Sequence, residues 1–246
     1  MDLKKYINMP NVELTQEIKG KLSQPGGITK TNFEDKNDVL LHKNLHTECG
    51  YDVMKDGFYL VSMYTAMPNV TKEMIDWWFW WHAQDAERYK AWYPGEHLSI
   101  SYDKKDKEYF QSKTVPVFKA VTHYPTERVG PLVAPLSIKF VSPTDFGFSQ
   151  EIMDENNVAT IVCGHVGAFK DLIPNTEMSH IYFKTDDGLY SVSRFWLGKR
   201  VKNKLLRKIF VTEKQAKGMA EHCFIEYGNF VKKIPQMYSE WLSENI

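Results

Sequence analysis

The amino-acid sequence predicts an α+β domain in which one long C-terminal helix lies across a curved antiparallel sheet. Two observations support this class. Strand-like runs follow one another between residues 97 and 198 with short connections, and a single long helical period then occupies the end of the chain. Packing such a helix on such a sheet buries the apolar face of both and leaves room for a cavity between them.

The first 56 residues differ in character from the rest of the chain. Residues 1–56 hold short helical candidates and polar turns, so we expect an N-terminal extension packed on the core. The main domain then comprises residues 57–246. It opens with the apolar run FYLVSMYTA at 58–66, bounded by Gly57 and Pro68, which predicts a buried strand.

A tryptophan-rich helix is expected next. Thr71 can cap a helix that runs to about Trp92, where the YPG sequence at 93–95 ends it, because proline disfavours helix in the residue before it. The stretch WWFWWHAQDAERYKAWYPGEH at 77–97 holds five of the seven tryptophans of the chain. Tryptophans spaced in this way on one helical face indicate core packing more often than a ligand pocket.

Further strands and a hairpin should complete the sheet. The hairpin is EMSHIYFKT followed by LYSVSRFWLG, joined at Asp186-Asp187-Gly188, where the glycine favours a tight turn. The other strand candidates are HLSISY at 97–102, VPVFKAVTHY at 115–124, LSIKFVS at 136–142 and NVATIVCGHVG at 157–167.

The final helix has a clear start. Thr212 followed three residues later by Gln215 fits a capping box. Pro235 should kink the helix or end it early. The apolar side chains that recur at a helical period include Ala216, Ala220, Cys223, Tyr227, Ile234 and Trp241.

Composition excludes several classes of partner. Thirty-one basic and 31 acidic side chains cancel, so nothing directs the chain to nucleic acid or to an anionic membrane. No apolar run approaches the roughly 18 residues of a membrane helix, and no secretory signal is evident. The cysteines Cys49, Cys163 and Cys223 form no CxxC pair, which favours packed thiols in the cytoplasm. The neutral composition permits a homodimer without indicating one.

Two histidines and two glutamates could form a metal site. His222 and Glu226 lie four apart on one helical face and could bind one ion, although a solvated or hydrogen-bonded pair is the commoner explanation. His97 follows the Pro-Gly turn and could enter a cavity or pack as an ordinary histidine. Glu127, in TERVG, could equally form a surface ion pair with Arg128. Together the four would suit Zn²⁺, but their spacing alone cannot unite them.

A family resemblance unites them. Through WWFWWH at 77–82, RYKAWYPGEH at 88–97, SRFWLG at 193–198 and AEHCFIEY at 220–227, the chain resembles the diacetylphloroglucinol hydrolase and phloretin hydrolase family. The resemblance implies a helix-grip fold like that of START domains. It also implies hydrolytic cleavage of the carbon–carbon bond between an acyl group and a phloroglucinol ring, releasing a carboxylic acid and a phenol.

The resemblance also assigns roles to residues. It implies one zinc ion per chain, held by a ligand set that it carries over to His97, Glu127, His222 and Glu226. It favours His165, in CGHVG, as the catalytic acid or base, although a core histidine is the plain alternative.

The remaining roles concern the substrate, an aromatic ketone. Tyr89 resembles a tyrosine that binds a substrate oxygen, and His180 and Tyr182 share a strand face that could line the cavity. His82 is expected to be structural or to support a ligand. The alternative function is a non-catalytic carrier of hydrophobic aromatic ligands, since one fold can host both roles.

Overall fold

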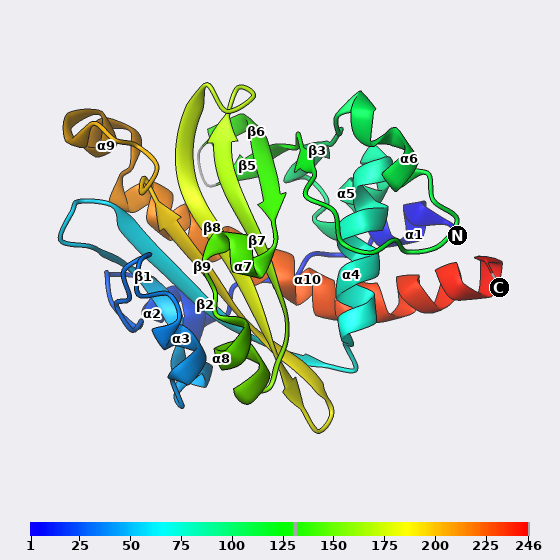
Figure 1. Cartoon of the computed structure of the whole chain (residues 1–246), viewed down its shortest axis with the longest axis horizontal. Helices are drawn as coiled ribbons and strands as arrows, with labels where there is room; N and C mark the ends of the chain where they lie inside the picture. The colour runs from blue at the N-terminus through cyan, green and yellow to red at the C-terminus, as the bar shows by residue number, and fades with distance from the viewer. Residues whose placement is uncertain (130–131, 246) are drawn as a thin grey trace.

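One antiparallel sheet and one long helix organise the molecule. Within residues 1–129 and 132–245, which the computed structural model describes, nine strands form a sheet in the order β1-β2-β9-β8-β7-β6-β5-β3, with β4 beside β6. The helix α10 (Glu213–Asn245) crosses behind this sheet in Figure 1. The helix-grip architecture expected from the sequence is therefore confirmed.

The strands differ greatly in length. They are β1 (Cys49–Val53), β2 (Tyr59–Pro68), β3 (His97–Ser99), β4 (Thr122–His123), β5 (Thr126–Val129), β6 (Leu132–Val141), β7 (Val158–Ala168), β8 (Ile173–Thr185) and β9 (Gly188–Leu197). The longest ones, β2 and β6 to β9, form the continuous centre of the sheet, and the short ones lie at its ends.

The shorter helices lie on both faces of the sheet. Figure 1 shows α7 and α8 in front of the sheet, whereas α10 lies behind it. The helices are α1 (Leu3–Ile7), α2 (Gln16–Lys21), α3 (Asp38–Leu41), α4 (Lys72–Trp81), α5 (Ala86–Trp92), α6 (Lys107–Phe110), α7 (Pro143–Phe146), α8 (Gln150–Glu155) and α9 (Lys204–Phe210), with 3₁₀ turns η1 (Leu45–Thr47), η2 (His82–Gln84) and η3 (Lys104–Asp106).

The tryptophan-rich helix is broken where the sequence predicted continuity. Thr71 caps α4 as expected, its hydroxyl accepting a hydrogen bond from Met74 N. The helix then passes through η2 and stops at Asp85, whose backbone is extended. Asp85 accepts a hydrogen bond from Glu87 N at 2.8 Å and so caps a separate helix, α5. This local capping bond competes with helix continuation and explains why one predicted helix is two separate helices.

Two expected strands are shorter than predicted. The run at 97–102 is a strand only over β3, and the run at 115–124 is a strand only over β4. Pro116 has no backbone N–H to donate to a sheet, which is consistent with irregular structure before β4. The strands expected at 58–66, 136–142 and 157–167 and the hairpin of β8 and β9 are confirmed.

The capping box of α10 is present. Thr212 N donates to Gln215 Oε1 at 2.8 Å, and Gln215 N donates to Thr212 Oγ1 at 3.3 Å. The helix continues through Pro235 to Asn245, so the expectation that the proline could end it early is wrong. The apolar period predicted from Ala216 to Ile234 is fully buried on the sheet.

Two apolar cores cover the two faces of the sheet. The inner core lies between the sheet and helices α4, α5 and α10, and it contains Trp77, Trp78, Trp80 and Trp81. The outer core lies against the opposite face and contains Phe146 and Trp196, among others. The tryptophans of α4 pack against one another and against α10, with Trp77 and Trp81 stacked at 4.7 Å. Their predicted scaffold role is confirmed.

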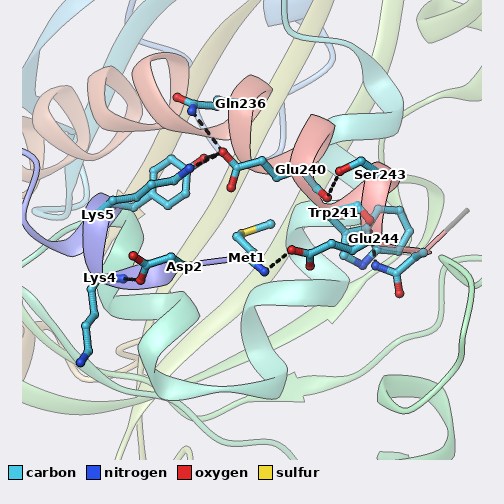
Figure 2. A network of polar contacts seen from close by, with 11 residues as sticks. Met1, Asp2, Lys4, Lys5, Gln236, Glu240, Trp241, Ser243 and Glu244 are labelled. Carbon is cyan, nitrogen blue, oxygen red and sulfur yellow. Dashed lines mark hydrogen bonds and ion pairs between the residues drawn. The ribbon is translucent and has the colours of Figure 1, made fainter.

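The N-terminal segment contacts both the sheet and the C-terminal helix α10. Its strand β1 pairs with β2 in the sheet. Helix α1 packs near the end of α10, where Lys5 contacts the carboxylate of Glu240 (Figure 2). The hydroxyl of Tyr6 donates a hydrogen bond to the same carboxylate at 2.8 Å. The division at residue 56 stays a prediction, but the segment before it contributes a strand to the sheet.

The three cysteines are free and buried, as expected. Among the described residues, no helix has both the length and the apolar character that crossing a membrane requires. The cytoplasmic location and the homodimer stay predictions.

A buried ion pair links the N-terminal segment to the centre of the sheet. Glu48 Oε2 and Arg194 Nη2 are 3.1 Å apart, with side chains 2% and 0% exposed. These two atoms are not aligned for a hydrogen bond, so the attraction between Glu48 and Arg194 is electrostatic. Both side chains also bind the backbone of Thr29, which fixes the chain before β1.

Glu48→Gln should therefore destabilise the fold by about 3 kcal/mol, because the buried Arg194 charge loses its partner. Chemical denaturation measures the change in the free energy of unfolding. The matched control is Asp52→Asn, which breaks the more exposed pair with Lys30 and should cost less than about 1 kcal/mol. Equal losses in the two variants would contradict the structural role assigned to Glu48.

Candidate active site

Three side chains from two distant parts of the chain converge on the face of the sheet that α10 covers. His97 begins β3, and His222 and Glu226 lie one turn apart on α10. Each offers one ligand atom within 4.8 Å of the others. His97 Nε2 lies 3.2 Å from Glu226 Oε1. His222 and Glu226 are weak evidence for a metal site as a sequence pattern. In the structure, His97 lies beside them and supplies a third possible ligand.

The turn before β3 directs the His97 ring. His97 N donates to Tyr93 O at 3.0 Å, and Gly95 occupies a positive φ of 88° that glycine tolerates readily. The ring nitrogen Nδ1 lies 3.2 Å from Tyr89 O, and the ring stacks on that of Tyr89 at 4.0 Å. These contacts leave Nε2 directed at α10.

Burial keeps both imidazoles neutral. Desolvation lowers the pKa of His97 and of His222 to about 4, so neither ring carries a charge at neutral pH. Desolvation also raises the pKa of Glu226 to about 7. The Nε2 atoms of His97 and His222 are buried and have no hydrogen-bond partner among the described residues. Two unpartnered neutral nitrogens beside a buried carboxylate are a donor set that fits a divalent cation.

Glu127 lies beside this triad. It pairs with His97 across β5 and β3, and its carboxylate accepts a hydrogen bond from the hydroxyl of Tyr89. Its oxygens are not among the ligand atoms within 4.8 Å of one another. The structure therefore places Glu127 next to the site but engaged with Tyr89, and its role as a fourth ligand stays a prediction.

The triad faces a cavity between the sheet and the helices, lined from strands β4 to β9 and helices α4, α5 and α10. Its polar lining residues are His82, Tyr89, His123, Glu127, Thr176, His180, His222 and Glu226. The remaining walls are apolar and mostly aliphatic, with four aromatic side chains among them: Phe79, Trp92, Phe140 and Phe195.

Two other predicted residues differ in their access to the cavity. His180 lines it, and its Nδ1 lies 2.8 Å from Ser193 Oγ. Tyr182 is fully buried with its hydroxyl 3.1 Å from that of Tyr227, and among the described residues it is not part of the lining. His82 lines the cavity and bonds Trp78 O through Nδ1 at 2.6 Å, as a supporting histidine would.

The structure does not bring His165 to the cavity. Successive side chains of a strand point to opposite faces. On β7, Val166 lines the cavity and Cys163 packs in the outer core, so His165 shares the outer face with Cys163. Its Nδ1 lies 2.5 Å from Glu177 Oε2 on β8. The strand alternation explains why the catalytic role predicted for His165 lacks geometric support.

His123 is a cavity residue that the sequence analysis missed. It lies on β4 and is 2% exposed, and within the part of the chain that the structure describes its buried Nε2 has no hydrogen-bond partner. Burial holds the pKa of His123 well below its usual value, so the ring is neutral. Its strand-like surroundings gave a signal for burial, but nothing in the sequence showed which face it would take.

Comparison with known proteins gives a consistent family. The family model described as the DAPG hydrolase PhiG domain matches residues 30–239. Phloretin hydrolase from Eubacterium ramulus is 30% identical over 220 residues, which cover 85% of this chain and 78% of that protein.

Two further similarities are more partial. 2,4-Diacetylphloroglucinol hydrolase from Pseudomonas protegens is 28% identical over 68% of this chain, and the match spans 55% of that protein. Among solved structures, protein Ms6760 from Mycobacterium smegmatis aligns over 74% of this chain and 91% of its own, with a TM-score of 0.38 and 11% identity.

Proposed function

The chain belongs to the DAPG hydrolase PhiG domain family, and from this membership we propose that it is a zinc-dependent hydrolase of acylated phloroglucinols. It would cleave the carbon–carbon bond between the acyl carbonyl and the ring, releasing a carboxylic acid and a phenol. The observation that carries this proposal is the buried triad of His97, His222 and Glu226, which faces a cavity with apolar walls and several polar side chains. Hydrolase family membership disfavours the alternative of a non-catalytic carrier.

The triad would hold Zn²⁺ through His97 Nε2, His222 Nε2 and a carboxylate oxygen of Glu226. When bound, Zn²⁺ polarises a ketone carbonyl and makes water more acidic. Glu127 is the proposed fourth ligand, and release of the Tyr89 hydroxyl would free its oxygen. Tyr89 could then donate its hydrogen bond to the substrate.

The reaction needs a proton at the ring carbon. Water adds its oxygen to the carbonyl carbon, the bond from that carbon to the ring breaks, and the ring carbon gains a proton. A phloroglucinol ring makes this feasible, because ring protonation yields a dienone-like tautomer whose departing fragment is a stabilised enolate. A neutral histidine in the cavity can relay such a proton.

His123 suits that role better than His165. Its unpartnered Nε2 is buried in the cavity wall, whereas His165 is bound to Glu177 on the opposite face. His180 and Tyr89 would orient the ring hydroxyls, and the apolar walls would exclude water from the reacting carbon.

Incubation of zinc-loaded protein with phloretin and with diacetylphloroglucinol tests the reaction itself. We expect a carboxylic acid and a phloroglucinol-type phenol in equal amounts, detected by liquid chromatography. If both ketones persist unchanged, the proposed activity is wrong.

The metal site is tested by a matched pair of substitutions on α10. Glu226→Gln should reduce bound zinc from about one ion per chain to nearly none after dialysis, because the site loses its anionic ligand. Glu221 lies on the same helix but forms an ion pair with Lys217, so Glu221→Gln should retain the ion. Elemental analysis reads both variants, and a Glu226→Gln protein that keeps its full zinc content would refute this site.

The acid/base assignment is tested by His123→Gln and His165→Gln. The first should reduce kcat by about 10²-fold or more with zinc content unchanged, because a proton relay is lost. The second should keep kcat within about threefold, since its ring lies on the outer face of the sheet. The reverse result would restore His165 as the catalytic residue.

A further inference from the structure

The N-terminal segment bonds both elements that present the proposed metal ligands. Asn11 Nδ2 donates a hydrogen bond to Pro94 O at 3.0 Å, in the turn that leads to His97. Asn11 Oδ1 accepts a hydrogen bond from Asn229 Nδ2 at 2.9 Å, on the helix that carries the other two ligands. One amide side chain therefore bridges the turn and the helix.

The helix end of this bridge is buried close to the triad. Asn229 is fully buried and lies three residues after Glu226, about one turn further along α10. Beside it, a Cβ atom on Gly228 would lie 3.0 Å from Val12 Cγ1, so the glycine lets the segment approach the helix closely. The N-terminal segment is thus seated on α10 next to a proposed ligand.

Both polar groups of the Asn229 amide are bonded to this segment. Its Nδ2 donates to Asn11, and its Oδ1 accepts a hydrogen bond from Val12 N at 2.9 Å. Leaving a buried donor or acceptor without a partner costs more free energy than a typical hydrogen bond contributes. Undocking of the segment would deprive Asn229 of both partners, which explains why the segment docks at this position.

The bridge acts on a dimension to which metal ligands are sensitive. His97 Nε2 and Glu226 Oε1 are 3.2 Å apart, and they come from the two elements that Asn11 joins. Metal–ligand distances vary by only about 0.2 Å in well-formed sites. The bonds of Trp92 and Lys233 fix the end of α5, whereas that of Asn11 fixes the turn after it. A small change in the separation of this turn from α10 would therefore weaken metal binding.

We propose that Asn11 and Asn229 are positioning residues for the metal site, so that docking of the N-terminal segment and zinc binding strengthen each other. This inference rests on the proposed function, which supplies the metal. Among the described residues, neither asparagine belongs to the triad or to the cavity lining, so each acts through the turn or the helix. Coupling between two binding events is reciprocal. The segment should therefore raise zinc affinity by the same factor by which zinc favours the docked segment.

Substitution of the bridge tests its effect on zinc affinity. Asn11 is half-buried, so Asn11→Ala should leave the protein folded while it breaks the bond to Pro94 O. We expect the zinc dissociation constant, measured by competition with a chromogenic chelator, to rise about tenfold. Asn229→Ala should have a similar or larger effect. The double variant should bind zinc little more weakly than Asn229→Ala alone, because both changes break one bridge.

A matched control loosens the same segment far from the triad. Tyr6 donates to Glu240, about four turns beyond Glu226 on α10 and near the end of the helix that Figure 2 shows. Tyr6→Phe should lower the free energy of unfolding of the metal-free protein, measured by chemical denaturation. Its zinc dissociation constant should stay within about twofold of the parent value.

Hydrogen exchange at the Val12 amide gives the reciprocal test, because this N–H is bonded to Asn229 only while the segment is docked. Zinc should slow this exchange about tenfold in the parent protein and much less in Asn11→Ala. Identical exchange with and without zinc in the parent would overturn the coupling.

The outcomes separate the inference from the proposed function. If the parent protein binds no zinc, both are wrong. If the parent binds zinc and the Asn11 and Asn229 variants bind it as tightly, the bridge only stabilises the fold and the inference alone is wrong. A tenfold loss of zinc affinity in Tyr6→Phe would also overturn it, since any loosening of the segment would then suffice. A parent that binds zinc without cleaving either ketone refutes the proposed reaction alone, and the zinc affinities still decide the inference.

Discussion

The contact between the end of α5 and the middle of α10 is the constraint on which the proposed metal centre depends. Trp92 Nε1 donates to the backbone oxygen of Glu226 at 2.9 Å. Seven residues further along α10, the fully buried Lys233 donates to Ala91 O at 2.9 Å. An ammonium at the C-terminal end of a helix satisfies carbonyls that have no partner within that helix. These bonds hold the turn that leads to His97 against the helix that carries its two partners.

The N-terminal segment reinforces the same contact. Asn229, fully buried on α10, accepts a hydrogen bond from Val12 N and donates one to Asn11, whose own amide donates to Pro94 O at 3.0 Å. The chain around residues 11 and 12 therefore bridges α10 to the turn before His97. These positions precede the region of family similarity, which begins at residue 30, yet they bind the elements that present the triad.

Burial stabilises one half of the inner core and destabilises the other. Around Trp77 and Trp81 it is dry packing of large rings, which stabilises the fold through apolar area removed from water. Around the triad the same desolvation leaves His97 and His222 neutral and without partners at Nε2. Unpaired buried polar atoms reduce stability, so the site represents a cost that ligand binding would relieve.

The main helices and long strands, and the residues proposed to bind the metal, follow from the sequence, whereas the break between α4 and α5 and the shortness of β3 and β4 do not. Hydrophobic periodicity, the cap at Thr212 and the turn before Gly188 depend on neighbours in the chain, and each was predictable for that reason. Family motifs supplied His97, His222 and Glu226 as a group. Only the tertiary structure decided which side chains meet: strand alternation turned His165 outward, and the register of β3 with β5 set Glu127 opposite His97. A short strand such as β4 gives no local signal of its facing, so His123 became visible only when the sheet and helices enclosed the cavity.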